Sequence, residues 1–137
     1  MANATAGTTR CAVLVGPYQS GKTSLFEALL HATGTIERKG TTTAGNTVGD
    51  ASDEARKRQA STEISIGHGT YLDDSWVFID TPGSVEFAQE TRNACLAADI
   101  AIVVVDSEAQ KIPACAPILK FLDEHDIPRM VFINKID

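Results

Sequence analysis

The sequence predicts an α/β domain in which helices cover both faces of a mostly parallel sheet. Four short apolar runs, rich in Val and Ile, are continuous rather than alternating, and they comprise residues 11–15, 76–79, 100–105 and 130–133. Such runs are typical of strands that are covered on both faces. Helical patterns separate the runs, and this alternation favours right-handed crossovers in a doubly wound, three-layer α/β/α fold.

Three segments carry the apolar stripe of a helix that packs against a sheet. They comprise residues 21–32, 86–98 and 117–125. In the first segment Leu25 and Leu29 lie on one stripe, and Phe26 widens it. In the last segment Pro117 suits the first turn of a helix, because an N–H group at that position would have no partner within the helix.

One further strand is expected at an edge of the sheet. Residues 62–72 alternate apolar with polar side chains, which is the pattern of a strand with one exposed face. A tight turn at Asp73 and Asp74 would join it to the strand that begins at Trp76. The two strands would be antiparallel, so we expect one antiparallel edge strand beside the parallel ones.

Composition limits the class of protein. The chain has 137 residues, of which 43% are hydrophobic and 22% charged, and a net charge of -6, which fits one globular domain. This acidic balance argues against a surface that reads nucleic acid directly. Three cysteines without metal-ligand spacing indicate buried free thiols in a reducing compartment. Because neither a signal peptide nor a membrane span is recognisable, we expect a cytoplasmic monomer without a membrane partner.

Two segments depart from the regular alternation. Residues 1–9 are expected to form a disordered tail before a domain that spans residues 10–137. Residues 33–62 are rich in Thr, Gly and Ser and carry almost no apolar side chains. A long loop in a compact domain is usually functional or disordered, and both alternatives stay open here. Taken alone, the charge cluster at residues 53–58 is typical of a solvated face.

The strongest motif is GPYQSGKT, which matches the pattern GxxxxGK[ST] directly after the first strand and at the start of the first helix. Gly16 and Gly21 let the backbone bend so that several N–H groups point at one anion. Lys22 can reach the β- and γ-phosphates of a nucleotide, and the Thr23 hydroxyl can bind Mg²⁺. The motif therefore predicts a P-loop NTPase fold. Its candidate nucleotide-binding residues are Gly16, Pro17, Tyr18, Gln19, Ser20, Gly21, Lys22, Thr23 and Ser24.

A second motif, DTPG, follows the second apolar run. Asp80 stands at the carboxyl end of a strand, where open α/β sheets bind ligands, and can hold Mg²⁺ opposite Thr23. The Gly83 N–H group can bond to a terminal phosphate, and loss of that phosphate would release residues 80–92 as a switch. Taken alone, Asp80 could instead be a turn or cap residue. The expected nucleotide contacts of this segment are Asp80, Thr81, Pro82 and Gly83.

The third motif, NKID, follows the last apolar run. Asp137 can accept hydrogen bonds from the N1–H and 2-amino groups of guanine, Asn134 can bond to the other edge, and Lys135 can cover the ring. Adenine lacks both donors and would leave the carboxylate unpaired, which costs roughly 10⁴-fold in sites of this kind. Alone, an Asn and an Asp at a strand end often only cap a turn, and an ATP-using protein is the alternative. The order of the three motifs favours a guanine nucleotide, GTP or GDP.

With these motifs in order, the sequence resembles the GTP-binding domain of translational GTPases, and elongation factor G in particular. DTPGSVEF at residues 80–87 is similar to that family's DTPGHVDF, and RQAST at residues 58–62 is similar to its RGITI switch segment. In that register Ser61 takes the position of the family's threonine that closes over Mg²⁺ and the γ-phosphate, and Thr62 is the off-by-one alternative. The resemblance implies a GTPase that the ribosome stimulates.

The sequence departs from the family pattern at three places. Ser84 stands where the family has the histidine that positions the attacking water, and its shorter side chain would need a second water or Glu86 to take that role. Gln19 replaces an aspartate of the phosphate loop, which removes a charge near the phosphates. The chain stops at Asp137, before the family's Ser-Ala loop and final helix, so we expect a C-terminally truncated domain. One face of its sheet would expose apolar surface, and we therefore expect marginal stability and weak nucleotide affinity.

Two functions follow from these residues. The first is Mg-dependent hydrolysis of GTP. Its candidate catalytic residues are Lys22, Gly83 and Ser84. Its candidate metal ligands are Thr23, Ser61 and Asp80. The alternative is a regulatory module that binds GTP or GDP and hydrolyses it little, which the replacements at Ser84 and Gln19 favour.

Overall fold

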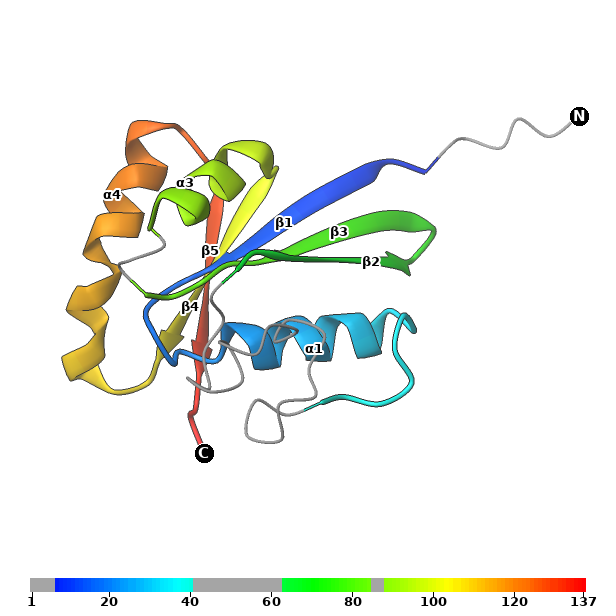
Figure 1. Ribbon diagram of the computed structural model, residues 1–137, viewed down its shortest axis with the longest axis horizontal. Helices are drawn as coiled ribbons and strands as arrows, with labels where there is room; N and C mark the ends of the chain where they lie inside the picture. The colour runs from blue at the N-terminus through cyan, green and yellow to red at the C-terminus, as the bar shows by residue number, and fades with distance from the viewer. Residues whose placement is uncertain (1–6, 41–62, 85–87) are drawn as a thin grey trace, which may run out of the picture.

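The computed structural model describes residues 7–40, 63–84 and 88–137, which contain a five-stranded sheet in the order β2-β3-β1-β4-β5 (Figure 1). The strands are β1 (Thr9–Val15), β2 (Ser65–Tyr71), β3 (Asp74–Asp80), β4 (Ile100–Asp106) and β5 (Arg129–Asn134). β1 pairs in parallel with β3 and β4, β4 pairs in parallel with β5, and β2 runs antiparallel to β3. The predicted mostly parallel sheet with one antiparallel edge strand is confirmed.

Helices cover both faces of this sheet. They are α1 (Lys22–Ala32), α3 (Ala88–Ala97), the 3₁₀ helix η2 (Ala109–Cys115) and α4 (Ala116–Glu124). Figure 1 shows α1 on one face of the sheet and α3 with α4 on the other. The three-layer fold is therefore confirmed, although the sequence pattern did not reveal η2. None of the described helices is long and apolar enough to cross a membrane.

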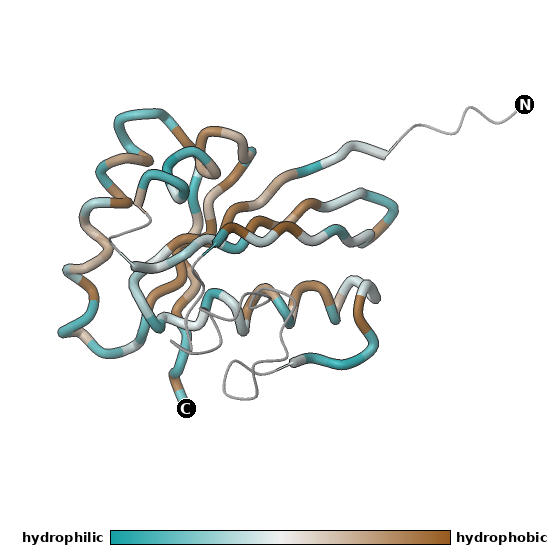
Figure 2. Tube along the Cα trace, viewed as in Figure 1, coloured by the Kyte–Doolittle hydropathy of each residue, from teal (hydrophilic) through white to brown (hydrophobic). Residues whose placement is uncertain are grey.

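Alternate residues of β1 pack into two separate cores. Ala12 and Leu14 lie in the core beneath α1, together with Phe26. Val13 and Val15 lie in the core on the opposite face, beneath α3 and α4. These four strand side chains are at most 1% exposed. Figure 2 shows the hydrophobic stretches along the central strands and at alternating positions of α1. Because β1 is packed on both faces, the loop that follows it starts from a rigid support.

The hairpin between β2 and β3 differs from the prediction by one residue. Leu72 and Asp73 form the turn, with φ of 50° and 66°, and Asp74 already pairs with Tyr71. Two consecutive positive φ values provide the twist that a two-residue hairpin needs. The predicted turn at Asp73 and Asp74 is therefore wrong. The sequence could not locate the turn because no Gly or Asn marks it.

β5 departs furthest from the sequence pattern. Its apolar run, taken alone, predicts cover on both faces, but Met130, Val131 and Ile133 are 49%, 55% and 57% exposed, and the exposed apolar surface that was expected on the sheet lies here. The physical reason is that the two cores of the described residues form over β1, β3 and β4, and neither includes a residue of β5, which stands at the end of the sheet order. The parallel register still places the end of β5 beside the end of β4, because Asn134 pairs with Asp106.

Several predicted segments lie partly outside the described residues. The loop 33–62 is described as far as residue 40, and the description omits residues 1–6 of the tail and 85–87 of the switch segment. Regular structure begins at Thr9, one residue before the start that the sequence predicts for the domain. All three cysteines are free thiols, as predicted; Cys95 and Cys115 are buried, but Cys11 is only half-buried, so the predicted burial is wrong there.

Candidate functional site

The loop between β1 and α1 bends sharply over the ends of two other strands. Gly16 and Gly21 have φ of 149° and 97°, and Gln19 between them has φ of 56°. A Cβ atom on Gly16 would collide with the carbonyl oxygen of Val104 in β4. A Cβ atom on Gly21 would collide with the side-chain amide of Asn134 at the end of β5. Gly16 is therefore required by its close approach to the backbone of β4 as well as by its conformation, and Gly21 is required by its positive φ.

The loop opens directly into α1. Gly21 is the N-cap residue and has no side chain with which to cap the helix. The first turn of a helix presents N–H groups without intrahelical partners, and the helix dipole adds a partial positive charge there. An anion is the natural partner of such an end when a glycine-rich loop surrounds it.

Lys22 folds back into this loop. Its Nζ donates hydrogen bonds to the carbonyl oxygens of Gly16 (3.1 Å) and Pro17 (2.9 Å), and the residue is only 6% exposed. Burial lowers the pKa of Lys22 to about 8, and the neighbouring Asp80 carboxylate opposes that shift. A Cβ atom on Gly83 would lie 2.5 Å from the Lys22 Nζ. Phosphate oxygens in the loop would give the ammonium group stronger, charged acceptors than these carbonyls.

Thr23 and Asp80 meet between α1 and β3. The Thr23 hydroxyl donates a hydrogen bond of 2.7 Å to Asp80 Oδ2, and the two residues are 8% and 0% exposed. A hydroxyl and a carboxylate oxygen are the donor types that Mg²⁺ takes beside phosphate and water oxygens, so this pair fits a magnesium ion. Ser61, the third predicted ligand, lies outside the described residues.

The segment after Asp80 is held by hydroxyl groups. The Thr81 hydroxyl donates a hydrogen bond to the Leu14 carbonyl oxygen in β1 (2.6 Å), and that of Thr91 in α3 donates one to the Pro82 carbonyl oxygen (3.1 Å). Because the Thr81 hydroxyl faces β1, its side chain supports the sheet edge. Thr81 could contribute to a nucleotide site only through its backbone.

Ser84 faces a cavity of about 590 Å³ between the loop and α3. Pro17, Gly83 and Arg92 also line this cavity, so Ser84 lies beside the loop that precedes α1. The residue is half-buried. Glu86, a candidate partner of Ser84, lies outside the described residues.

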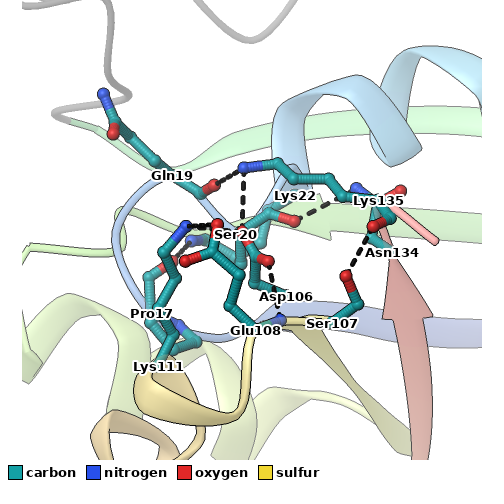
Figure 3. A network of polar contacts seen from close by, with 10 residues as sticks. All are labelled: Pro17, Gln19, Ser20, Lys22, Asp106, Ser107, Glu108, Lys111, Asn134 and Lys135. Atoms are coloured by element: carbon teal, nitrogen blue, oxygen red, sulfur yellow. Dashed lines mark hydrogen bonds and ion pairs between the residues drawn. The ribbon is translucent and has the colours of Figure 1, made fainter. Parts of the chain in front are cut away.

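The third motif contacts the first. The Asn134 side-chain amide donates a hydrogen bond to the Ser20 carbonyl oxygen (3.1 Å), and the Lys135 Nζ donates one to the Gln19 carbonyl oxygen (2.6 Å) (Figure 3). Asp137 is exposed just beyond this junction. The structure thus gathers the predicted residues of all three motifs at the carboxyl ends of the parallel strands. Tyr18 and Ser24 lie in the same region and are exposed.

Sequence reasoning missed Asp106, which ends β4 and belongs to the same junction. Its carboxylate accepts hydrogen bonds from Lys111 Nζ (2.9 Å) and Lys135 Nζ (3.1 Å). The sequence did hold a signal for Asp106 as a site residue, because it comes at the end of an apolar run, as Asp80 does. The surrounding residues form no short motif, so the pattern alone did not separate Asp106 from an ordinary strand-end aspartate.

Comparison with known proteins places these features in context. Residues 8–137 match the family described as the elongation factor Tu GTP binding domain. The chain is 45% identical, over its whole length, to an elongation factor G-like protein of Synechocystis sp., of which it covers 20%. It is 38% identical over 119 residues, 86% of the chain, to the oxytetracycline resistance protein of Streptomyces rimosus, of which it covers 18%.

A solved structure is similar as well. A crystal structure from Thermus thermophilus matches with a TM-score of 0.84 and 34% identity, over 93% of this chain and 19% of the other. The chain spans about a fifth of the length of these relatives.

Proposed function

Because the chain belongs to the elongation factor Tu GTP binding domain family, we propose that it binds GTP and GDP with Mg²⁺ and hydrolyses GTP as the switch domain of an elongation factor G-like translation factor. The ribosome is the proposed partner that stimulates hydrolysis. Relatives named as elongation factor G-like proteins support this role.

One observation carries the proposal. The loop at residues 16–21 accepts hydrogen bonds from a lysine of α1 and from an amide at the end of β5, and the hydroxyl–carboxylate pair of α1 and β3 begins two residues after the loop. The lysine and the pair suit a magnesium-bound polyphosphate, and the amide belongs to the segment expected to bind guanine. Three motifs that are far apart in the sequence therefore converge on one loop, as a single nucleotide would require.

The proposed roles divide along the nucleotide. Lys22 and the loop N–H groups neutralise and orient the phosphates, and the Gly83 N–H group bonds to the γ-phosphate. Mg²⁺, when bound, neutralises phosphate charge and is held by Thr23 and Asp80, with Ser61 as the further candidate. Asn134, Lys135 and Asp137 select the guanine ring.

Binding is tested with GDP that carries a fluorescent N-methylanthraniloyl group. We expect unlabelled GTP and GDP to displace it and ATP to fail at equal concentration, because adenine lacks the two donors that Asp137 would accept. Chelation of Mg²⁺ should weaken GTP binding. Equal competition by ATP would contradict guanine selection, and no binding of labelled GDP at all would contradict the proposed function.

A second candidate function is a regulatory switch with little hydrolysis, and Ser84 favours it. Its short hydroxyl lines the cavity beside Pro17 and has no ring nitrogen that could orient a water. A single-turnover assay with ribosomes separates the two candidates. A burst of phosphate supports hydrolysis, whereas clear GTP binding without a burst supports the switch. Ser84→His should raise stimulated turnover if the family's geometry is intact around this position.

A further inference from the structure

A buried carboxylate at the end of β4 lies against the guanine-side motif. Asp106 is 4% exposed. Its Oδ2 accepts hydrogen bonds from two ammonium groups, those of Lys111 (2.9 Å) and Lys135 (3.1 Å), and its Oδ1 accepts one from the Glu108 N–H (3.1 Å). Figure 3 shows these contacts converging on the one aspartate. A buried carboxylate bonded in this way is held in one orientation.

Hydrogen bonds hold Lys135 both at its backbone and at its side-chain ammonium group. Its backbone has φ of 57°, a conformation that a lysine rarely adopts. The Ser107 hydroxyl donates a hydrogen bond to the Lys135 carbonyl oxygen (2.5 Å), which holds the backbone against the segment that follows β4. The Nζ at the far end of the side chain reaches both Asp106 and the Gln19 carbonyl oxygen. The lysine stem is therefore stretched between β5 and the phosphate loop.

The charge balance explains why the lysine stays there. A lysine side chain at a surface loses conformational entropy when it is held, and a neutral carbonyl alone is a modest partner for it. Asp106 adds a charged acceptor that is itself buried. Lys111, which also pairs with Glu108 (2.9 Å), supplies the second positive charge that keeps this carboxylate ionised. The pKa of Asp106 is accordingly lowered to about 2, mainly by the hydrogen bond from Lys111.

We propose that Asp106 is a positioning residue for guanine nucleotide: it holds the Lys135 ammonium group against the phosphate loop and so slows nucleotide release. The inference rests on the proposed function, because it assigns Lys135 to the guanine site. Preorganisation is the physical basis, since a side chain that is already ordered loses less entropy when ligand binds. Asp106 itself does not touch the nucleotide in this proposal.

The test measures release of N-methylanthraniloyl-GDP after addition of excess unlabelled GDP in the presence of Mg²⁺. Asp106→Asn keeps the shape of the side chain and removes its charge. Release should be about tenfold faster, the effect of losing a hydrogen bond to a charged group. The matched control is Asp123→Asn, which also removes an ion pair, with Arg129, but on the surface near the end of α4. The control should release nucleotide at the wild-type rate.

A double-mutant cycle separates positioning from general stabilisation. Lys135→Met keeps an apolar stem and removes the ammonium group, so Asp106 has no lysine left to position. In that background Asp106→Asn should speed release by less than about twofold, because the two substitutions remove the same interaction. A full tenfold effect in both backgrounds would overturn the proposal, since Asp106 would then act independently of Lys135.

Two further outcomes are decisive. If Asp106→Asn does not fold, as judged by its circular dichroism, Lys135→Met alone decides, and release at the wild-type rate from that variant overturns the inference. If the wild-type chain does not bind labelled GDP, the proposed function itself fails. If the wild-type chain binds it and Asp106→Asn releases it unchanged, only the role of Asp106 fails.

Discussion

The carboxyl ends of β3 and β4, the two strands that flank β1, carry buried aspartates with different partners. Asp80 accepts a hydrogen bond from the neutral Thr23 hydroxyl, next to the phosphate loop. Asp106 accepts hydrogen bonds from two ammonium groups of the protein itself. The two residues are 0% and 4% exposed, so burial does not distinguish them. The two ammonium groups that donate hydrogen bonds directly to Asp106 set it apart.

This difference indicates that an aspartate at the carboxyl end of a strand has two roles in this sheet, one structural and one in ligand binding. A buried carboxylate needs a positive partner or a proton, because desolvation penalises its charge. At Asp106 the chain supplies that partner through Lys111 and Lys135, and the result is a fixed structural junction. Asp80 lies near the buried Lys22 ammonium group, and its proposed further partner is an external Mg²⁺ ion, so the result is a ligand-dependent site. The following predictions test whether this division holds.

Asp80→Asn should have the largest effect. Loss of the carboxylate should weaken Mg-dependent GTP binding by about 100-fold, the upper range for residues that support a metal site. Fluorescent-nucleotide titrations with and without a chelator measure this effect. The matched control is Asp74→Asn, at the opposite end of β3, where the carboxylate pairs with Arg10 (3.2 Å). If Asp80→Asn kept the wild-type dependence on Mg²⁺, the metal role would be lost.

Gly83→Ala should have the next largest effect. The added Cβ would lie 2.5 Å from the Lys22 Nζ and 3.0 Å from the Pro17 carbonyl carbon, so the lysine has to shift. Losing one hydrogen bond from a charged donor should weaken GTP binding by about tenfold. Ser75→Ala, at the exposed start of β3, is the control and should leave GTP binding unchanged. If Gly83→Ala and the wild type bound GTP with equal affinity, the present position of the Lys22 ammonium group would not be required for GTP binding.

The same comparison explains what the sequence could and could not predict. Asp80 was recognisable because its partners lie in short motifs whose local spacing requires a strand, a loop and a helix in turn. Asp106 follows an apolar run just as directly, but its lysine partners lie 5 and 29 residues further along the chain. Only the pairing of β4 with β5 brings Lys135 beside it. No local pattern records such a contact.

The errors in the predicted fold have a similar origin. Continuous apolar runs identified β1, β3, β4 and β5 correctly, since each run is a local property of the chain. The exposure of β5 depends on which strands the described helices cover, and an apolar run does not encode that. The turn at Leu72 and Asp73 was missed by one residue because a leucine at positive φ has no sequence signal.

Ser107→Ala should have a smaller effect, on the rate at which labelled GDP is released, because it removes a support of Lys135 beside Asp106. The Ser107 hydroxyl bonds to the Lys135 carbonyl oxygen (2.5 Å), where the backbone has positive φ. A neutral hydrogen bond contributes about 1 kcal/mol, so release of labelled GDP should be about threefold to fivefold faster. Ser75→Ala, on the exposed start of β3, should leave release unchanged. A larger effect of Ser107→Ala than of Asp106→Asn would make the backbone, rather than the charge, the main support of Lys135.

The smallest expected effect is a pH dependence that belongs to Asp106. Its pKa is lowered from an ordinary 3.8 to about 2 by Lys111, the Glu108 N–H and Lys135. As pH falls below about 4 the unfolded chain takes up this proton before the folded chain does, so folding stability from Asp106 is present above pH 4 and declines toward pH 2. Urea unfolding at pH 6, 4 and 3 should therefore show that the difference in free energy of unfolding between the wild type and Asp106→Asn narrows below pH 4.

The control Asp123→Asn should show almost no such difference from the wild type at any of these pH values, because exposed ion pairs contribute little. A difference for Asp106→Asn that stayed constant from pH 6 to pH 3 would mean that it does not come from the ionised Asp106 carboxylate, and the contrast with Asp80 would lose its electrostatic basis.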